Sequence, residues 1–355
     1  MIDFQYNYPL LGTEAAIVSA AVQKHAAESN AWVSQKALAG TAEHRAVAAS
    51  FLSQWGAEIS ANRVFLCSGG HSAVSVALTR ASLDGAAVAV DELTYPAFRG
   101  TAANRGMKVI ACAGDDDGML PRALADAVTS QNVKAVYLTP TVHNPLGSVM
   151  PESRRLALAN AIRQHSLWLI EDDAYRFLEP DGPAPISWLA PERSFYIYSF
   201  TKPVALGMKV SYLVVPDAFA DGLDDLVSQV NSGTSLLFAG VLTSLVMDGT
   251  VQRLIAEKQA LGRARQESIS SGLAGWKIRA HRNGFHSWIE LPQGIDGAAF
   301  CAACKSRGVL LTPGSRYGNG NPEFTRCFRL AVGNERDRDR ITEGLAIVQQ
   351  TLSSF

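Results

Sequence analysis

Ionisable residues stand directly after two apolar, β-rich runs, where α/β sheets bind their ligands. Lys202 follows the run F-Y-I-Y-S-F, and Asp172 and Asp173 end the run L-W-L-I-E-D-D. Ligands of open α/β sheets lie beyond the carboxyl ends of the strands, whereas Lys108 and Lys134 precede strands. A lysine held at that edge can be desolvated, which favours the neutral amine that bonds to a carbonyl carbon. Taken alone, however, Lys202 is more simply an ordinary surface lysine.

The acidic residues at the end of the second run allow two interpretations. Three carboxylates after an apolar run are costly to bury unless they face solvent, a metal ion or a cation. They could form a magnesium site, but the next segment holds no further carboxylate cluster. Tyr175 follows Asp172 at three residues' spacing, and a carboxylate beside a protonated pyridine nitrogen would meet the same requirement.

Two turns with glycine also follow predicted strands. S-G-G-H at 68–71 leads from a strand into a helix, where close backbone approach and free amides can hold a phosphate. H-N-P-L-G at 143–147 follows another strand. Each signal is weak alone, because a strand-to-helix turn needs glycine anyway and Asn-Pro is a common turn.

A β-α-β series must position these residues. Apolar runs that do not alternate with polar residues predict strands buried on both faces, at 64–67, 86–90, 109–112, 135–138, 167–170, 195–198 and 211–215. Helical patterns separate most of them, which predicts an α/β fold with one mainly parallel, seven-stranded sheet between helices. The last three strands lie close together in the sequence, which allows one of them to run antiparallel.

The pattern changes in the last third of the chain. One long helical stretch at about 240–270 precedes short strands and helices after Trp276, an α+β grouping. We expect an N-terminal arm and first helix at 1–45, a large ligand-binding domain at 46–265 and a small C-terminal domain at 266–355. Cys301 and Cys304 form a C-x-x-C without a second pair, and we interpret them as small apolar residues on one helix face.

Composition disfavours several kinds of partner. The 355 residues are 47% hydrophobic and 18% charged, with a formal net charge of -1. No basic block indicates nucleic acid or an anionic membrane, and no apolar run approaches the roughly 20 residues that cross a bilayer. The N-terminus lacks a signal-peptide pattern and the five cysteines are scattered, so we expect a cytoplasmic protein with reduced thiols. The low charged fraction favours apolar surface buried between subunits.

Four motifs in order resemble the class I/II aminotransferases of fold type I. They are T-P-T-V-H-N-P-L-G at 139–147, E-D-D-A-Y at 171–175, S-F-T-K at 199–202 and F-R-L-A-V-G at 328–333. Each is short, but their order and spacing together are specific, and the resemblance covers about residues 60–335. It is closest to the branch that also supplies the effector domains of GntR-type bacterial regulators. The resemblance implies a fold type I transferase that uses pyridoxal 5′-phosphate (PLP) and works as a homodimer.

The resemblance also implies a role for each site residue. Lys202 would hold the cofactor and later move a proton, and Asp172 rather than Asp173 would pair with the ring nitrogen. Arg329 would bind the substrate's α-carboxylate with its guanidinium fork, with Asn144 also beside the substrate. The other cofactor contacts would come from Gly70 and His71 (backbone amides to the phosphate), Ser199 (hydroxyl to the phosphate), Tyr95 (stacking on the ring), Tyr175 and Asn144 (phenolic oxygen) and Lys209 (phosphate).

Three features depart from the family pattern. Lys209 stands where the family usually has an arginine that clamps the phosphate, so the charge is kept and the fork is lost. His71 replaces a common glutamine at a position where only the backbone is required. The tyrosine that many members lend to the partner's phosphate site has no clear counterpart, and Trp32 is the nearest aromatic residue.

The resemblance implies an aminotransferase that acts on an α-amino acid and a 2-oxo acid by ping-pong half-reactions. A lyase, decarboxylase or cyclase on the same fold is the main alternative, because the fold does not decide among these reactions. A non-catalytic PLP-binding effector domain is a further alternative. It ranks lower because no basic helix-turn-helix pattern fits into the first 40 residues. No metal site is expected.

Overall fold

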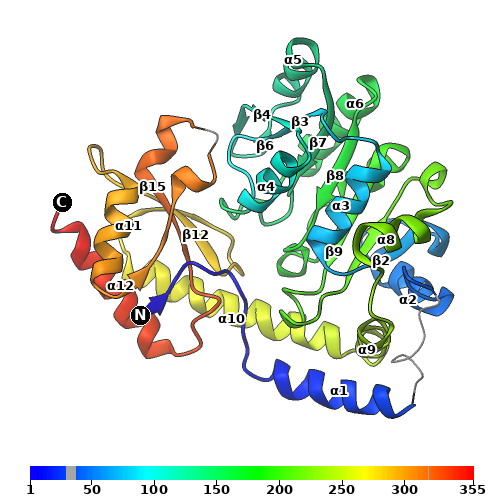
Figure 1. The fold of residues 1–355 in the computed structure, drawn as a ribbon. Helices are drawn as coiled ribbons and strands as arrows, with labels where there is room; N and C mark the ends of the chain where they lie inside the picture. The colour runs from blue at the N-terminus through cyan, green and yellow to red at the C-terminus, as the bar shows by residue number, and fades with distance from the viewer. Residues whose placement is uncertain (29–36, 319) are drawn as a thin grey trace.

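A mainly parallel sheet and a smaller antiparallel sheet form the two halves of the protein. The computed structural model describes residues 1–28, 37–318 and 320–355. Figure 1 shows helix α10 (Thr250–Gly272) running from the small sheet to the underside of the large one. The N-terminus lies against the small sheet, and helix α1 (Glu14–Glu28) packs against α9 of the large half.

Seven strands form the large sheet, as the sequence predicts. Strand β10 is antiparallel to β2 and β9, and the other pairs are parallel. Only residues 200–210 separate β9 from β10, too few for the crossover that a parallel return needs. The spatial order is β2 (Val64–Cys67), β10 (Ser211–Val214), β9 (Ser194–Ser199), β8 (Trp168–Asp172), β7 (Val133–Leu138), β3 (Ala87–Asp91) and β4 (Lys108–Cys112).

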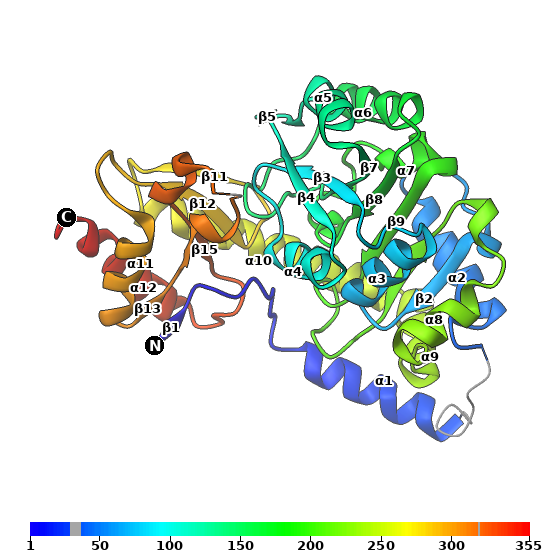
Figure 2. The same ribbon diagram turned by 45° about the horizontal axis from the view of Figure 1, so that its top comes forward.

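Helices cover both faces of this sheet because its strands are apolar on both sides. In β9, Phe195 and Ile197 pack on one face, and Tyr196 and Tyr198 pack on the other. The first face carries α3 (Gly70–Arg80), α4 (Pro96–Asn104) and α8 (Leu223–Asn231) (Figure 2). The second carries α2 (Ala42–Ser53), α5 (Pro121–Gln131), α6 (Glu152–Gln164), α7 (Ile186–Leu189), α9 (Leu236–Met247) and α10.

The small sheet packs against two helices and takes in the start of the chain. Ile2 and Phe4 are buried in its core. Cys301 and Cys304 are buried in the same core on one helix, α11, which agrees with the apolar interpretation of the C-x-x-C. The strands of the small sheet are, in spatial order, β11 (Lys277–Ala280), β12 (His286–Glu290), β15 (Cys327–Ala331) and β14 (Thr312–Pro313). This half also contains the parallel pair β1 (Ile2–Asp3) and β13 (Val309–Leu310) and the helices α11 (Gly297–Ser306) and α12 (Arg338–Leu352). The hairpin of β5 (Gly114–Asp115) and β6 (Gly118–Met119) forms a separate two-stranded sheet.

The stretch predicted to be helical at about 240–270 is helical, and the structure divides it into two helices. Helix α9 ends at Met247 and α10 begins at Thr250. Gly249 caps α10 with a left-handed φ of 79°, which a glycine adopts at no steric cost. Asp248 accepts a hydrogen bond from the Thr250 amide at 2.9 Å and fixes the break.

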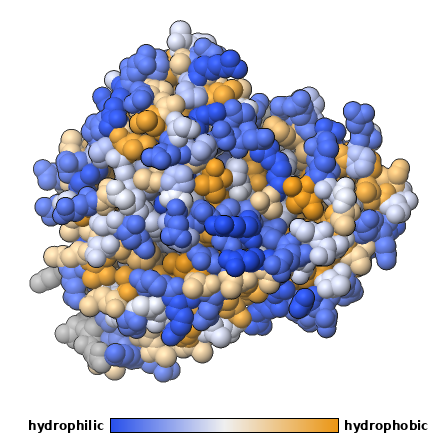
Figure 3. Space-filling view, turned by 180° about the vertical axis from the view of Figure 1, so that it is seen from behind, coloured by the Kyte–Doolittle hydropathy of each residue, from blue (hydrophilic) through white to orange (hydrophobic). Residues whose placement is uncertain are grey.

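The surface does not by itself identify a partner. On the face shown in Figure 3, apolar side chains are interspersed with polar and charged ones. In the described part of the chain, no single helix is long and apolar enough to cross a membrane; α8 and α9 together would be, but they meet at 117°. The homodimer therefore stays a prediction.

Two helical glycines differ in the space around them, and this yields a stability prediction. A Cβ at Gly262 of α10 would lie 2.0 Å from the carbonyl oxygen of Asn283, whereas a Cβ at Gly100 of α4 would meet nothing within 4 Å. Gly262→Ala should therefore destabilise the fold by about 1–3 kcal/mol through overpacking, although alanine favours helix. The matched Gly100→Ala should stabilise it by about 0.5–1 kcal/mol. Thermal or urea unfolding measures both, and equal effects would contradict the close approach of α10 to the small domain.

Candidate functional site

A cavity of about 210 Å³ opens at the carboxyl ends of the central strands of the large sheet. Every residue predicted to bind the cofactor lines it: Gly70, His71, Tyr95, Asn144, Asp172, Tyr175, Ser199, Lys202 and Lys209. The other lining residues are Tyr8, Ser68, Gly69, Tyr137, Thr139, Thr141, Ala174, Thr201 and Leu206. Trp32 lies outside the described residues.

Lys202 is half-buried and presents its amine to this cavity. Its Nζ donates to the main-chain oxygen of Asn7 at 3.0 Å and lies 4.2 Å from the ring centroid of Tyr8. Burial, and next the positive charges of Arg329 and Lys209, lower the pKa of Lys202 from 10.5 to about 7. A large share of this amine is therefore neutral near pH 7, as a nucleophile must be.

A second buried lysine holds the loop that carries Lys202. Lys258 of α10 donates to the carbonyl oxygens of Lys202 and Val204 at 2.9 and 3.0 Å. Its Nζ also lies 3.3 Å from a carboxylate oxygen of Glu14, the first residue of α1. Lys258 thus ties α10 and the N-terminal segment to the loop, so the position of the Lys202 amine depends on all three.

The side chains of the three consecutive acidic residues point alternately to opposite sides of β8 and its C-terminal end. Glu171 is buried and accepts from the main chain and hydroxyl of Ser187, at 2.7 and 2.6 Å, away from the cavity. Asp173 is also buried and accepts from the Tyr196 hydroxyl at 3.0 Å. Of the three, Asp172 alone lines the cavity. Among the described residues, no three His, Cys, Asp or Glu side chains gather as metal ligands would.

One carboxylate oxygen of Asp172 is buried without a hydrogen-bond donor among the described residues. Its Oδ2 accepts from the Tyr137 hydroxyl at 2.9 Å, but its Oδ1 is buried and has no hydrogen-bond partner among the described residues. Burial raises the pKa of Asp172, because a carboxylate away from water needs a positive partner to stay ionised. A cationic N–H group in the cavity would satisfy both.

The turn after β2 forms an anion cradle. Gly69 has a φ of 95° and precedes the free amides at the N-terminus of α3. A Cβ at Gly70 would lie 3.6 Å from the Cβ of Ser199, so the turn passes close to the end of β9. Ser199 Oγ is 3.0 Å from Thr201 Oγ1, and Lys209 lies beside Gly69. Amides, hydroxyls and an ammonium group thus converge, as phosphate binding requires.

Two stacked rings form one wall of the cavity. The Tyr95 and His71 rings are nearly parallel, with centroids 5.9 Å apart. The Tyr95 hydroxyl is 3.3 Å from His71 Nε2. His71 therefore contributes its side chain as well as its backbone, which the sequence did not indicate.

Arg329 of β15 reaches from the small sheet to the edge of the cavity. Its Nη1 donates to Asn144 Oδ1 at 3.0 Å, its Nη2 donates to the Gln5 carbonyl, and its buried Nε has no partner among the described residues. Glu335, an acidic residue near Arg329 in the sequence, pairs with Arg340. Arg329 is not among the residues that line the cavity, but it contacts Asn144, which is one of them. Within the described chain, no carboxylate lies in ion-pair distance of this buried guanidinium.

Sequence reasoning missed several residues that surround these groups. Asn7 and Tyr8 of the N-terminal segment, Tyr137 of β7 and His286 of β12 contact the predicted site. Tyr137 had a signal, since it is the polar residue near the end of the strand A-V-Y-L. The other three had none, because their contacts join segments far apart in the chain.

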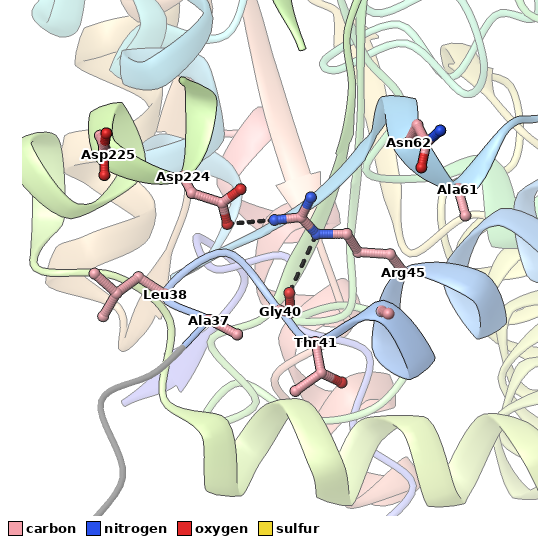
Figure 4. Close-up of a pocket in the computed structure, with 10 residues that line it drawn as sticks. Ala37, Leu38, Gly40, Thr41, Arg45, Ala61, Asn62, Asp224 and Asp225 are labelled. Atoms are coloured by element: carbon pink, nitrogen blue, oxygen red, sulfur yellow. Dashed lines mark hydrogen bonds and ion pairs between the residues drawn. The ribbon is translucent and has the colours of Figure 1, made fainter. Parts of the chain in front are cut away.

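A second hollow lies between α2 and α8, but its side chains are less suited to binding a ligand. Figure 4 shows the Arg45 side chain extending across it to Asp224, with which it pairs, and donating to the Gly40 carbonyl. A cation already paired in this way offers little to a ligand. The cavity at the sheet edge is therefore the candidate active site.

The cavity fits an aromatic ligand with a protonated ring nitrogen, an anionic phosphate and a carbonyl carbon. Asp172 Oδ1 has no donor among the described residues, the turn at Gly69 and Gly70 presents free amides, and Lys202 presents an amine with a lowered pKa. Pyridoxal phosphate carries all three groups, so the residues present fit this cofactor.

Comparison with known proteins agrees with the geometry. The family model described as "Aminotransferase class I and II" matches residues 1–345. Kynurenine aminotransferase from Pyrococcus horikoshii, solved with PMP, has a TM-score of 0.88 at 23% identity, over 100% of this chain and 91% of that one. Pyridoxal phosphate is the cofactor that the family and these neighbours indicate.

Curated relatives by sequence include transcriptional regulators. The uncharacterized HTH-type regulator YdeF of Bacillus subtilis is 24% identical over 331 residues, 93% of this chain and 72% of YdeF. YjiR of Escherichia coli, another uncharacterized HTH-type regulator, is 26% identical over 302 residues, 82% of this chain. The aligned part is 64% of YjiR, less than two thirds of its length. With a family model matched over nearly its whole length and a cavity that fits the cofactor, this chain belongs to the class I and II aminotransferase family of pyridoxal phosphate proteins.

Proposed function

We propose that the protein is a PLP-dependent aminotransferase that moves an amino group between an α-amino acid and a 2-oxo acid by ping-pong half-reactions. The observation that carries this proposal is the Lys202 amine, buried at the ligand edge of the sheet with a pKa lowered to about 7, opposite a carboxylate with a free buried oxygen. A nucleophile and a cation-binding carboxylate that line one cavity suit amino-group chemistry.

Lys202 would act twice. As a neutral amine it would bond to the cofactor's carbonyl carbon and so hold the cofactor in the cavity. After the substrate amine takes its place, the released Lys202 Nζ would accept a proton from the α-carbon of the substrate. The main-chain oxygen of Asn7, 3.0 Å from Nζ, would orient the amine by accepting one of its hydrogens.

Asp172 and Tyr175 would set the charge on the cofactor. When bound, pyridoxal phosphate supplies an electron-accepting ring that stabilises negative charge at the substrate's α-carbon. Asp172 would keep the ring nitrogen protonated through Oδ1, while Tyr137 holds Oδ2. Burial holds the pKa of Tyr175 above its ordinary value, so this hydroxyl keeps its proton and can donate it toward the phenolic oxygen. Gly70, His71, Ser199 and Lys209 would hold the phosphate.

Arg329 would select substrates with a free α-carboxylate. A carboxylate would replace the Gln5 carbonyl as its partner and also pair with the free Nε. Asn144 Oδ1 holds the other side of the fork. We expect the sites to form in a homodimer, as the family resemblance implies.

A PLP-binding sensor is the second candidate function, because HTH-type regulators are among the relatives. The same fold also supports lyase, decarboxylase and cyclase reactions. An amino-acid screen of the loaded protein separates these functions. An aminotransferase should release one 2-oxo acid per site, and no ammonia or carbon dioxide, until a second 2-oxo acid is added. Binding without any released product would favour the sensor, and ammonia or carbon dioxide would indicate the other chemistries.

The lowered pKa of Lys202 predicts a pH dependence in the cofactor-free protein. The neutral fraction of the amine should rise as the pH increases through about 7, far below the ordinary 10.5. Acylation of Lys202 by dilute acetic anhydride, followed by peptide mass spectrometry, measures this fraction at each pH. Exposed Lys277 reports on the reagent in the same sample. If acylation of Lys202 instead climbed only near pH 10, the amine would not be desolvated.

The carboxylate role of Arg329 predicts a selective loss of substrate affinity. Arg329→Lys keeps the charge and removes the fork, so amino-acid binding should weaken about tenfold or more. The resting absorbance and the melting temperature should change little. Arg326→Lys on the surface of the small domain, where Arg326 pairs with Glu290, is the matched control. A large loss of thermal stability with unchanged substrate affinity would assign Arg329 a structural role instead.

A further inference from the structure

Asn7 contacts two of the residues that line the cavity without lining it itself. Its main-chain oxygen accepts from Lys202 Nζ at 3.0 Å, and its side-chain Nδ2 lies 2.9 Å from the Tyr175 hydroxyl. The same Nδ2 lies 2.8 Å from Nδ1 of His286. The side chains of Asn7 and His286 are buried, so water does not compete for these bonds.

The backbone around His286 decides which of its nitrogens carries the proton. His286 Nε2 lies 3.1 Å from the carbonyl oxygen of His143. A carbonyl oxygen only accepts, so Nε2 must carry a hydrogen and donate it. Burial, and next the charge of Arg329, lower the pKa of His286 to about 3, so the ring is neutral at physiological pH. Nδ1 therefore has no hydrogen and is an acceptor.

The histidine in turn fixes the Asn7 amide. An acceptor at Nδ1 requires the NH₂ group of Asn7 at 2.8 Å, because the reversed amide would bring two acceptors together. The second hydrogen of the same NH₂ then points to the Tyr175 oxygen. This orientation holds although Asn7 Oδ1 is left without a partner among the described residues. Tyr175 thus accepts from Asn7, and its own hydroxyl hydrogen is free for the cavity.

We propose that Asn7 and His286 are positioning residues of the active site that aim the Tyr175 hydroxyl hydrogen into the cavity. The relay runs from the His143 carbonyl through His286 and Asn7 to Tyr175. It rests on the proposed function, because the acceptor of that hydrogen is the phenolic oxygen of the bound cofactor. Without the relay, the Asn7 amide could turn, and Tyr175 would donate to Asn7 Oδ1 instead.

The titratable and charged groups near Tyr175 and His286 can be left unchanged in a test of the relay. Arg329, Tyr95 and Tyr317 face Tyr175, and Arg329, His143 and His281 face His286. A test should therefore add no charge. His286→Leu removes the acceptor and leaves the ring's neighbours unchanged. His286→Gln carries an amide donor and an acceptor at similar spacing and should preserve the relay, so it is the matched control.

The readout is the pH midpoint of the absorbance of the lysine-bound cofactor in the resting protein. A hydrogen donated to the phenolic oxygen stabilises its anion and keeps this midpoint low. His286→Leu should therefore raise the midpoint by about one pH unit, the worth of one hydrogen bond. His286→Gln should leave the midpoint where it is. Tyr175→Phe, which has no hydroxyl, gives the largest shift that the loss of this bond can produce. If His286→Leu does not fold, Asn7→Leu replaces it and should also raise the midpoint, because it removes the donor that orients Tyr175.

Three outcomes distinguish the inference from the proposed function. A raised midpoint in His286→Leu with an unchanged one in His286→Gln supports the relay. A shift in Tyr175→Phe with none in His286→Leu or Asn7→Leu overturns the relay and leaves the proposed function standing. No shift in Tyr175→Phe itself would overturn the relay and the role of Tyr175 in the proposed function, because Tyr175 would not then contact the cofactor, and the roles of Lys202 and Asp172 would stand. A merely structural role for His286 would lower thermal stability in both His286 variants without moving the midpoint.

Discussion

The site depends on keeping one lysine amine buried and neutral at the ligand edge of the sheet. An ammonium group removed from water and placed near other cations is costly, so burial and the charges of Arg329 and Lys209 together lower the pKa of Lys202 to about 7. The surrounding structure maintains this condition. Lys258 holds the loop by its main chain, and the N-terminal segment covers the amine with the Asn7 carbonyl. Lys209 and Arg329, whose charges lower this pKa, are also the groups proposed to bind the cofactor's phosphate and the substrate's carboxylate.

The edge of the sheet could be predicted from the sequence because strands and their ends are local features. Apolar runs predicted the seven strands, and the ionisable residues after them pointed to Asp172, Asp173 and Lys202, whereas Ser199 and the choice of Asp172 came from the family resemblance. The structure gives the physical reason for that choice, because the alternation of β8 turns Glu171 toward Ser187 and leaves Asp172 in the cavity with Ser199 and Lys202. The antiparallel β10 follows from the short connection before it.

The rest of the site depends on contacts that no local pattern records. Asn7 meets His286 across 279 positions of sequence, and Tyr175 across 168. The arm that carries Asn7 is fixed at its start by the pairing of β1 with β13 and at its end by Glu14 and Lys258. Neither contact has a motif. The break between α9 and α10 was missed for a different reason, since Gly249 lies between two patterns that are both helical.

A single measurement tests the central claim that Lys202 is the cofactor lysine. The loaded protein is reduced with borohydride, digested, and the modified peptide is located by mass spectrometry. If Lys202 holds the cofactor, one adduct forms, on Lys202; it is absent in Lys202→Ala and retained in Lys277→Ala. An adduct on Lys258, Lys209 or any other lysine would refute this assignment, as would an adduct that persists in Lys202→Ala.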